Sequence, residues 1–246
     1  MSSPVQHPPQ HENKILATLN PADDHDLLSK LQRVSLNQGE VVYEADRPIS
    51  HVYFPGTAVF SLLATMEDGS TAEVGPVGNE GMVGLRVFLG ADKTLDRVIV
   101  HVAGSAMRLK ASVLKTQLLA AHSGMPAKLS RYTQMLLAMT GQSGACNKLH
   151  KIEQQLARWL LMISDYVGDE LKLTHELMGL TLGVRRASIT EAANSLRDQG
   201  VIAYSRAHIR IVERNGLESL ACECYRVIKA EYEALYADLE KKPDPG

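Results

Sequence analysis

The hydrophobic positions in the first half of the 246-residue chain are spaced as in short β-strands. Between residues 27 and 109, apolar runs that alternate with polar residues are separated by closely spaced glycines. Asp68-Gly69 lies between two of these runs and tolerates the positive φ angles of a tight hairpin. Several short strands at this spacing predict a β-sandwich or barrel. The expected strands include residues 41–43, 51–54, 58–63 and 97–102.

The pattern becomes helical from about residue 111 to residue 166. Pro126 suits the first turn of a helix, and Ser123 lies close enough before it to act as a cap. Apolar positions then recur at alternating spacings of three and four, a heptad seam that suits a partner helix. Packing of this helix on its own β domain explains the same spacing, and both interpretations stay open. The seam consists of Leu129, Tyr132, Leu136, Met139, Ser143 and Cys146.

A third pattern, from residue 171 to residue 212, combines two short helices with two strands. Gly183 ends the first helix. The second helix begins after Val184 and buries only a thin stripe of small and apolar residues at helical spacing. Residues 201–212 predict two strands joined by a turn, so the whole segment predicts a winged helix-turn-helix. The buried stripe consists of Ile189, Ala192, Ala193 and Leu196.

The two ends of the chain lie outside these three patterns. Residues 1–20 are polar and contain several prolines, which predicts a disordered leader. Residues 217–242 predict one more amphipathic helix, which either docks on its own fold or adds a dimer contact. No stretch approaches the roughly 18 apolar residues of a membrane helix, and no apolar signal core opens the chain. We therefore expect a soluble cytoplasmic protein with no membrane partner.

The charged residues suggest a binding partner only in one segment of the chain. The chain has 26 Lys and Arg and 28 Asp and Glu, a formal net charge of −2 that excludes a histone-like polycation. Between Gly183 and Arg210, five arginines and two acidic residues leave a local formal charge of +3. Positive charge placed on a recognition helix and a wing favours a groove lined by phosphates over an ordinary solvated face.

Residues 173–202 resemble the DNA-binding module of the Crp/Fnr family of transcriptional regulators. The glycine-punctuated segment 80–85 resembles the β-roll sensor of this family, and the helix from Pro126 resembles its dimer helix. The resemblance implies an α+β fold with a cyclic-nucleotide-binding-like β-roll, a long dimerisation helix and a C-terminal winged helix-turn-helix. It places the β-roll at residues 21–122, the dimerisation helix at 123–147, the DNA-binding domain at 148–214 and a helical tail at 215–246.

The same resemblance assigns roles on the recognition helix. Arg186 falls where the family has a base-reading arginine, which offers two donors to guanine O6 and N7. Ala187 falls where many members have glutamate, so the target sequence should differ from theirs. The implied partners are double-stranded DNA with an inverted-repeat operator, a second copy of the chain and RNA polymerase. The candidate DNA contacts are Arg185, Arg186, Ser188, Thr190, Glu191 and Asn194, with Arg206 and His208 at the wing tip.

The sensor departs from the cyclic-nucleotide-binding members of the family. Their phosphate cassette has a Gly-Glu pair and an arginine, but here Met82 stands at the glutamate position and Arg97 is offset. Without its fixed positive partner the pocket binds a cyclic phosphate poorly, so we expect an unidentified small-molecule effector. Glu80 lies one residue too early in the sequence to belong to this cassette. We favour the interpretation that Glu80 is a surface carboxylate over the interpretation that the cassette is shifted. The candidate pocket residues are Glu80, Gly81, Met82, Arg97 and Thr140.

Neither metal nor enzyme chemistry is expected. The iron–sulfur sensors of the family carry several cysteines near the N-terminus, whereas the first cysteine here is Cys146. Cys222 and Cys224 accompany the apolar stripe of the tail helix, which favours packing over a metal site. No dinucleotide fingerprint or nucleophile–base motif is present. The sequence predicts a DNA-binding regulator whose β-roll senses an effector; the alternative is a nucleotide-binding regulatory module whose winged helix contacts protein.

Overall fold

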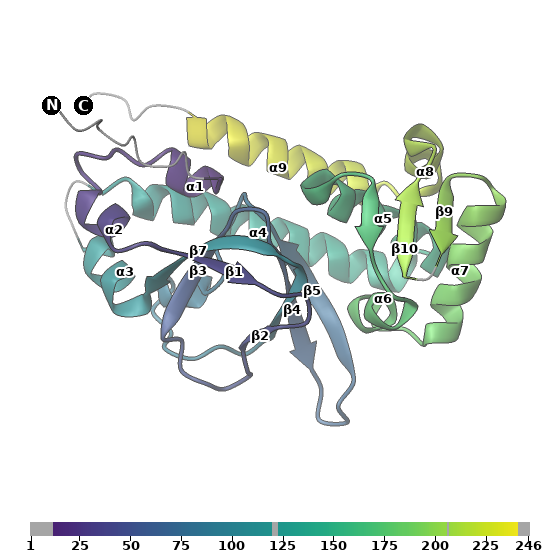
Figure 1. Ribbon diagram of the computed structural model, residues 1–246, viewed down its shortest axis with the longest axis horizontal. Helices are drawn as coiled ribbons and strands as arrows, with labels where there is room; N and C mark the ends of the chain where they lie inside the picture. The colour runs from purple at the N-terminus through teal and green to yellow at the C-terminus, as the bar shows by residue number, and fades with distance from the viewer. Residues whose placement is uncertain (1–11, 120–122, 206, 241–246) are drawn as a thin grey trace, which may run out of the picture.

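A computed structural model of the chain describes residues 12–119, 123–205 and 207–240. The long helix α4 (Met125–Leu149) runs beside a β-sandwich toward a smaller domain of helices and short strands (Figure 1). Helix α9 (Cys224–Glu240) lies along α4. The expected α+β fold is confirmed. None of the helices in the described part of the chain has the length and hydrophobicity of a membrane span.

Seven strands of the N-terminal β domain form two antiparallel sheets, with strand orders β1-β7-β3 and β2-β6-β4-β5. Alternating positions of β3 point inward, so that Val52 and Phe54 are fully buried. The hairpin between β4 and β5 turns at Asp68-Gly69, and Gly69 has φ 80°, as the Asp-Gly pair predicts. The strands are β1 Gln32–Leu36, β2 Val41–Tyr43, β3 His51–Pro55, β4 Val59–Thr65, β5 Thr71–Val77, β6 Arg97–Val102 and β7 Gly104–Lys110. The short helices are α1 Lys14–Ala17, α2 His25–Ser29, η1 Leu85–Val87 and α3 Ala111–Leu118.

The expected disordered leader is wrong over residues 12–20, while residues 1–11 lie outside the described part. The Oδ1 of Asn13 accepts from the amides of Ile15 and Leu16 at 3.1 and 3.2 Å and so caps α1. Its Nδ2 donates to the carbonyls of Pro55 and Gly81 at 3.0 and 2.9 Å, which fastens α1 to the sandwich. Ile15 and Leu16 are buried, so this segment belongs to the core of the N-terminal β domain.

The apolar seam of α4 faces its own chain. The amide of Met125 donates to the Ser123 Oγ at 3.2 Å, so Ser123 supports the start of the helix as expected. Leu129, Tyr132 and Met139 are 0% exposed, because β5 and α9 cover this side of α4. The prediction of a dimer interface at these residues is therefore wrong, and Leu136 is half-buried against the same core. The heptad spacing records packing within the chain, which was the second interpretation.

The smaller domain has the predicted winged helix-turn-helix. The Thr174 Oγ1 accepts from the Leu177 amide at 3.1 Å and caps the first helix, and Gly183, with φ 65°, ends it. The two predicted wing strands are present. A third strand, β8, pairs with them in the order β8-β10-β9 and is too short to be recognised from periodicity. The elements are α5 Ile152–Val167, β8 Glu170–Lys172, α6 His175–Leu182, α7 Arg186–Asp198, β9 Ile202–Ser205, β10 His208–Ile211 and α8 Arg214–Leu220.

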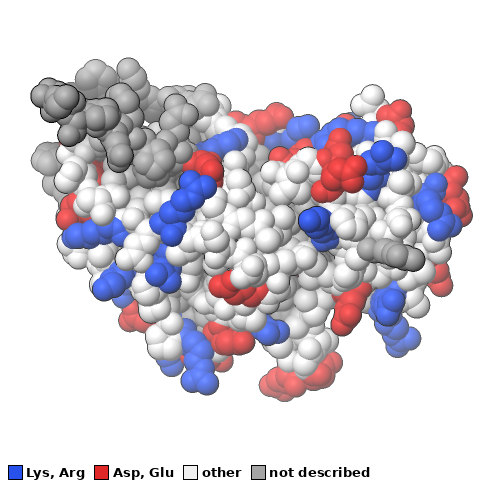
Figure 2. Space-filling view, viewed as in Figure 1, with Lys and Arg blue, Asp and Glu red and all other residues white. Residues whose placement is uncertain are grey.

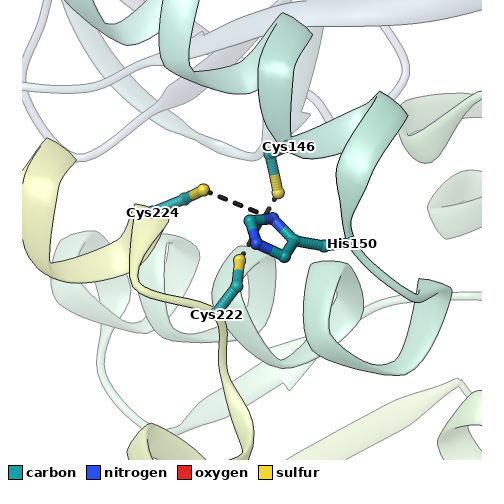
Figure 3. Close-up of side chains that lie close together, drawn as sticks. All are labelled: Cys146, His150, Cys222 and Cys224. Carbon is teal, nitrogen blue, oxygen red and sulfur yellow. Dashed lines mark hydrogen bonds between the residues drawn. The ribbon is translucent and has the colours of Figure 1, made fainter.

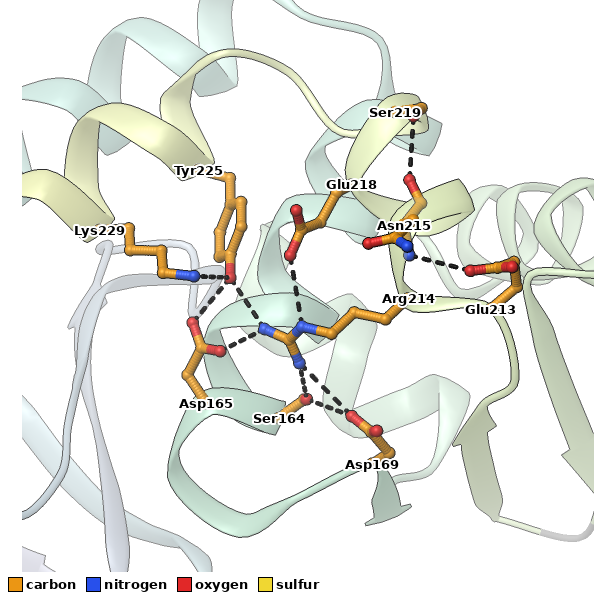
Figure 4. Close-up of polar contacts among 10 residues, drawn as sticks. All are labelled: Ser164, Asp165, Asp169, Glu213, Arg214, Asn215, Glu218, Ser219, Tyr225 and Lys229. Carbon is orange, nitrogen blue, oxygen red and sulfur yellow. Dashed lines mark hydrogen bonds and ion pairs between the residues drawn. The ribbon is translucent and has the colours of Figure 1, made fainter.

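The tail is two helices rather than the single one expected. Helix α8 ends at Leu220, and α9 begins at Cys224 and docks on α4 and α5. Arg214, the first residue of α8, connects α8 to α5 and α9. Its guanidinium contacts Ser164 at 2.8 Å and also the Asp165 carboxylate, both on α5 (Figure 4). The same guanidinium donates to the Tyr225 hydroxyl at 2.9 Å, at the start of α9. Of the two interpretations of the tail, the structure agrees with the one in which the tail docks on its own fold.

Candidate nucleic-acid interface

Helix α7 is held with one face inward and one face outward. Ile189, Ala192, Ala193 and Leu196, which form the predicted stripe, are all buried against α5 and α6. The small side chains of Ala192 and Ala193 allow α7 to lie close to the helices behind it. On α6, a Cβ at Gly179 would lie 3.0 Å from the Val184 carbonyl oxygen, so the turn between the helices leaves little room for a side chain there.

The outward face of α7 carries the predicted contacts. Arg185, Arg186 and Glu191 are exposed, and Ser188 and Asn194 are half-buried. Arg185 is the N-cap residue but its side chain makes no capping hydrogen bond, which leaves the first backbone N–H groups to another acceptor. The N-terminus of a helix attracts anions, so two arginines at this end favour phosphate and base edges.

Thr190 is part of an internal brace. Its hydroxyl lies 3.0 Å from both the Arg186 carbonyl oxygen and the Nδ1 of His175 on α6. The His175 ring stacks on Tyr204 of the wing, with centroids 4.4 Å apart and planes inclined by 17°. Burial, and secondarily the charge of Arg186, lower the pKa of His175, so its ring is neutral at neutral pH. His175 and Tyr204 therefore fix α6, α7 and the wing together, a role that no periodicity in the sequence reveals.

The wing also carries positive charge beside α7, but less than the start of α7 does. His208 is exposed and pairs with Ser205 across the hairpin. Arg206, the other predicted tip residue, lies outside the described residues. Arg210 is exposed and its Nε lies 3.9 Å from a Glu170 carboxylate oxygen. Figure 2 shows basic and acidic side chains interspersed over this view of the molecule, so the charge that favours DNA is local.

The winged helix-turn-helix domain contacts the N-terminal β domain at the turn between α6 and α7. A Cβ at Gly183 would lie 3.2 Å from the Ala72 Cβ on β5. The Gln38 side chain donates to the carbonyl oxygens of Lys172 on β8 and His101 on β6, each at 3.0 Å. The β4–β5 hairpin and the helix-turn-helix are thus in direct contact.

Residues 154–220 match the model of a family described as the Crp-like helix-turn-helix domain. The domain built on α7 is a Crp-like helix-turn-helix. FixK2 from Bradyrhizobium japonicum has a TM-score of 0.67 at 18% identity, over 78% of this chain and 98% of that chain. The c-di-GMP responsive global regulator CLP from Xanthomonas campestris has 0.64 at 13% identity, over 78% and 99%. A CRP family regulator from Thermus thermophilus has 0.65 at 15% identity, over 77% and 96%.

These similarities confirm the resemblance to Crp/Fnr transcriptional regulators. The family model establishes the Crp-like domain, and the solved structures establish the fold over the 77–78% of the chain that they match. No curated protein sequence matches the chain.

The candidate effector residues in front of the Crp-like domain are not brought into one open pocket. Glu80 is buried, not a surface carboxylate: its Oε1 accepts from the Gly78 amide at 3.0 Å and lies 3.1 Å from the Tyr166 hydroxyl. Burial raises the pKa of Glu80 to about 7. Tyr132 fills the space beside Gly81, where an added Cβ would lie 2.4 Å from the ring. Met82 is likewise buried in the core.

The other two candidates have separate partners. The Nε of Arg97, the first residue of β6, lies 3.4 Å from a Glu44 carboxylate oxygen. The Thr140 hydroxyl donates to the Leu136 carbonyl within α4, at 2.8 Å. A shifted phosphate cassette around Glu80 and Arg97 is therefore not assembled.

A different cavity, of about 240 Å³, opens between α1, α5 and α9. Tyrosines and charged side chains line it, and the Tyr166 hydroxyl lies 2.7 Å from that of Tyr232. Because the Tyr166 hydroxyl also contacts Glu80, the cavity shares groups with the N-terminal β domain and with the Crp-like domain. Its lining includes Lys14, Asp165, Tyr166, Tyr225, Tyr232 and Tyr236.

Proposed function

We propose that this protein is a sequence-specific DNA-binding transcriptional regulator that binds an inverted-repeat operator as a homodimer. The observation that carries the proposal is the exposed Arg186 at the start of α7, in a Crp-like domain with a wing beside it. Two recognition helices related by a two-fold axis would enter successive major grooves about 34 Å apart.

Selection of bound sequences from a randomised operator pool tests this proposal. Arg186→Ala should cost about 1–3 kcal/mol per half-site and relax the preference at one symmetric position. Arg197→Ala is the matched control, since Arg197 lies in the last turn of the same helix and pairs with Asp198 at 2.9 Å. A uniform loss of affinity in Arg186→Ala would assign Arg186 to phosphate. No enrichment by the wild type would refute the proposal.

We propose the exposed face of α4 as the dimer contact, in place of the buried seam. Leu137 is 69% exposed on this face. A Cβ at Gly141 or Gly144 would have nothing within 4 Å, so the backbone of a second α4 can approach closely. The heptad positions of this face include Ser130, Gln134, Leu137, Gly141 and Gly144.

Analytical sedimentation of two charge substitutions tests this contact. Leu137→Glu should place a carboxylate in the dimer interface and give monomers at micromolar concentration. Leu95→Glu is the control, because Leu95 is 63% exposed but lies in the loop before β6. A Leu137→Glu variant that stays dimeric, or a monomeric wild type, would contradict this contact.

We infer that the sensor and α9 respond to a small molecule and thereby control the DNA-competent state of the dimer. The cavity of about 240 Å³ supports this, since a molecule within it would touch both α5 and α9. A ligand that prefers one helix arrangement shifts the population toward it.

Fluorescence anisotropy of an operator fragment tests this coupling without a known ligand. Tyr166→Phe removes the hydroxyl between Glu80 and Tyr232 and should change operator affinity without changing the preferred sequence. Tyr53→Phe, which alters a half-buried tyrosine of β3, is the control. Equal affinities of Tyr166→Phe and the wild type would disprove coupling through this hydroxyl.

A further inference from the structure

Three thiols and one imidazole meet where α4 ends. Cys146 lies in the last turn of α4, and His150 is the residue that caps it. Cys222 lies in the connection between α8 and α9, and Cys224 is the first residue of α9. The three sulfurs and a ring nitrogen of His150 all lie within 4.8 Å of one another. Figure 3 shows the cysteine side chains pointing toward the imidazole from three directions.

Two of the distances between these atoms are close to those between ligands of one metal ion, and the others are at most 4.8 Å. A tetrahedral zinc ion has Zn–S bonds of about 2.3 Å and Zn–N bonds of about 2.0–2.1 Å, which place two sulfurs about 3.8 Å apart and a sulfur and a nitrogen about 3.6 Å apart. The sulfurs of Cys146 and Cys222 are 3.4 Å apart, and the Cys224 sulfur is 3.6 Å from the His150 Nδ1. All three cysteines are free thiols and all three are buried.

The surroundings orient the ligands. The His150 Nε2 lies 3.3 Å from a Glu223 carboxylate oxygen, which leaves Nδ1 facing the three sulfurs. Metal-binding histidines commonly donate their second ring N–H to a carboxylate in this way. The Gln142 Nε2 donates to the Cys224 sulfur at 3.1 Å, and the Gln155 Nε2 donates to the His150 carbonyl at 2.8 Å. Hydrogen bonds thus hold both a thiol ligand and the backbone of the histidine in place.

We propose that Cys146, His150, Cys222 and Cys224 form a structural site for one zinc ion. Three thiolates and an imidazole are a donor set that zinc prefers, and four protein ligands leave no open position for catalysis. An iron–sulfur cluster attaches its ligands to different irons, whereas these four atoms are close enough to share one ion. The site replaces the interpretation of Cys222 and Cys224 as packing residues.

The position of the site indicates that it would hold helices of the fold together. Helix α5, which opens the DNA-binding domain, begins at Ile152, two residues after His150. A zinc ion would fasten the junction between α4 and α5 to the start of α9. The next residue after Cys224 is Tyr225, whose hydroxyl lies 3.0 Å from Asp165 and 2.9 Å from the Arg214 guanidinium (Figure 4). Zinc and the Arg214 network would thus hold both sides of the same turn, so metal loss should loosen α9.

Metal analysis of the full-length protein, purified under reducing conditions after growth with zinc, tests the proposal. We expect one zinc ion per chain, and a cobalt-substituted protein with the intense visible and near-ultraviolet bands of tetrahedral thiolate ligation. Cys222→Ser and His150→Ala should each lower zinc content and lower the Tm in zinc-containing buffer. His25→Ala, which alters an exposed histidine of α2, should retain zinc and serves as the control.

Two further measurements keep the test independent of how the cysteine variants fold. Glu223→Gln keeps all four ligands and should weaken zinc affinity by about 10–100-fold in a chelator competition. Thiol modification of the wild type should release zinc in proportion to the cysteines modified. The proposal is overturned if reconstituted wild type binds no zinc, if thiol modification releases none, or if the stable form contains a Cys146–Cys222 disulfide.

Discussion

Helix α7 and the junction between the N-terminal β domain and α9 place charged and polar groups in opposite environments. On α7, Arg185 and Arg186 are exposed, and the inward face is entirely small or apolar. At the junction, Glu80 is fully buried among tyrosines and its Oε2 has no hydrogen-bond partner among the described residues. A surface charge costs little stability, whereas a buried one makes stability depend on packing and pH. Substitutions in the two regions should therefore have different kinds of effect.

The largest expected effect is on packing at the junction. Tyr132 is 0% exposed and fills the space against Gly81, so Tyr132→Ala should lower the free energy of unfolding by about 3–5 kcal/mol. Arg186→Ala should change the same quantity by less than about 0.5 kcal/mol, because Arg186 is exposed. Urea denaturation measures both. Comparable losses in the two variants would break the distinction between the regions.

A smaller effect should appear in the pH dependence of stability. Burial raises the pKa of Glu80 from its usual 4.5 to about 7, so between these values the folded chain holds a proton that the unfolded chain has released. Burial also raises the pKa of Glu73 to about 7, so both carboxyl groups should lower the free energy of unfolding as the pH rises through about 7. The Glu80 contribution should be a fall of about 1.4 kcal/mol between pH 6 and pH 8. Glu80→Gln should remove this contribution in urea denaturation at the two pH values. Glu67→Gln, at an exposed site, should leave it in place.

The smallest effect tests whether Thr190 reads DNA or braces the domain. Thr190→Val removes the hydroxyl shared with His175 and should lower the free energy of unfolding by about 1 kcal/mol. Thr190→Ser keeps the hydroxyl and should be close to the wild type. Selection from the randomised operator pool should give the same preferred sequence for all three proteins. A changed preference in Thr190→Val would place Thr190 among the base contacts.

Local patterns in the sequence were sufficient for most of the secondary structure. The Asp68-Gly69 hairpin, the helix supported by Ser123, and the inner face of α7 follow from turn chemistry and from side-chain periods of two and 3.6 residues. These are properties of residues close together in the chain. They place Arg186 on an outward face without knowledge of any distant contact.

The sequence could not predict contacts that depend on which distant segments of the chain pack together. The seam of α4 had the correct spacing for a partner helix, but only the fold decided that the partner is α9 of the same chain. Cys146 and His150 are four positions apart and Cys222 and Cys224 two, but His150 and Cys222 are 72 positions apart. The period of the apolar positions shows which face of a helix is buried, but not which element covers that face. The turn between α8 and α9 brings the two pairs together, so the tertiary structure alone decided that these four side chains meet.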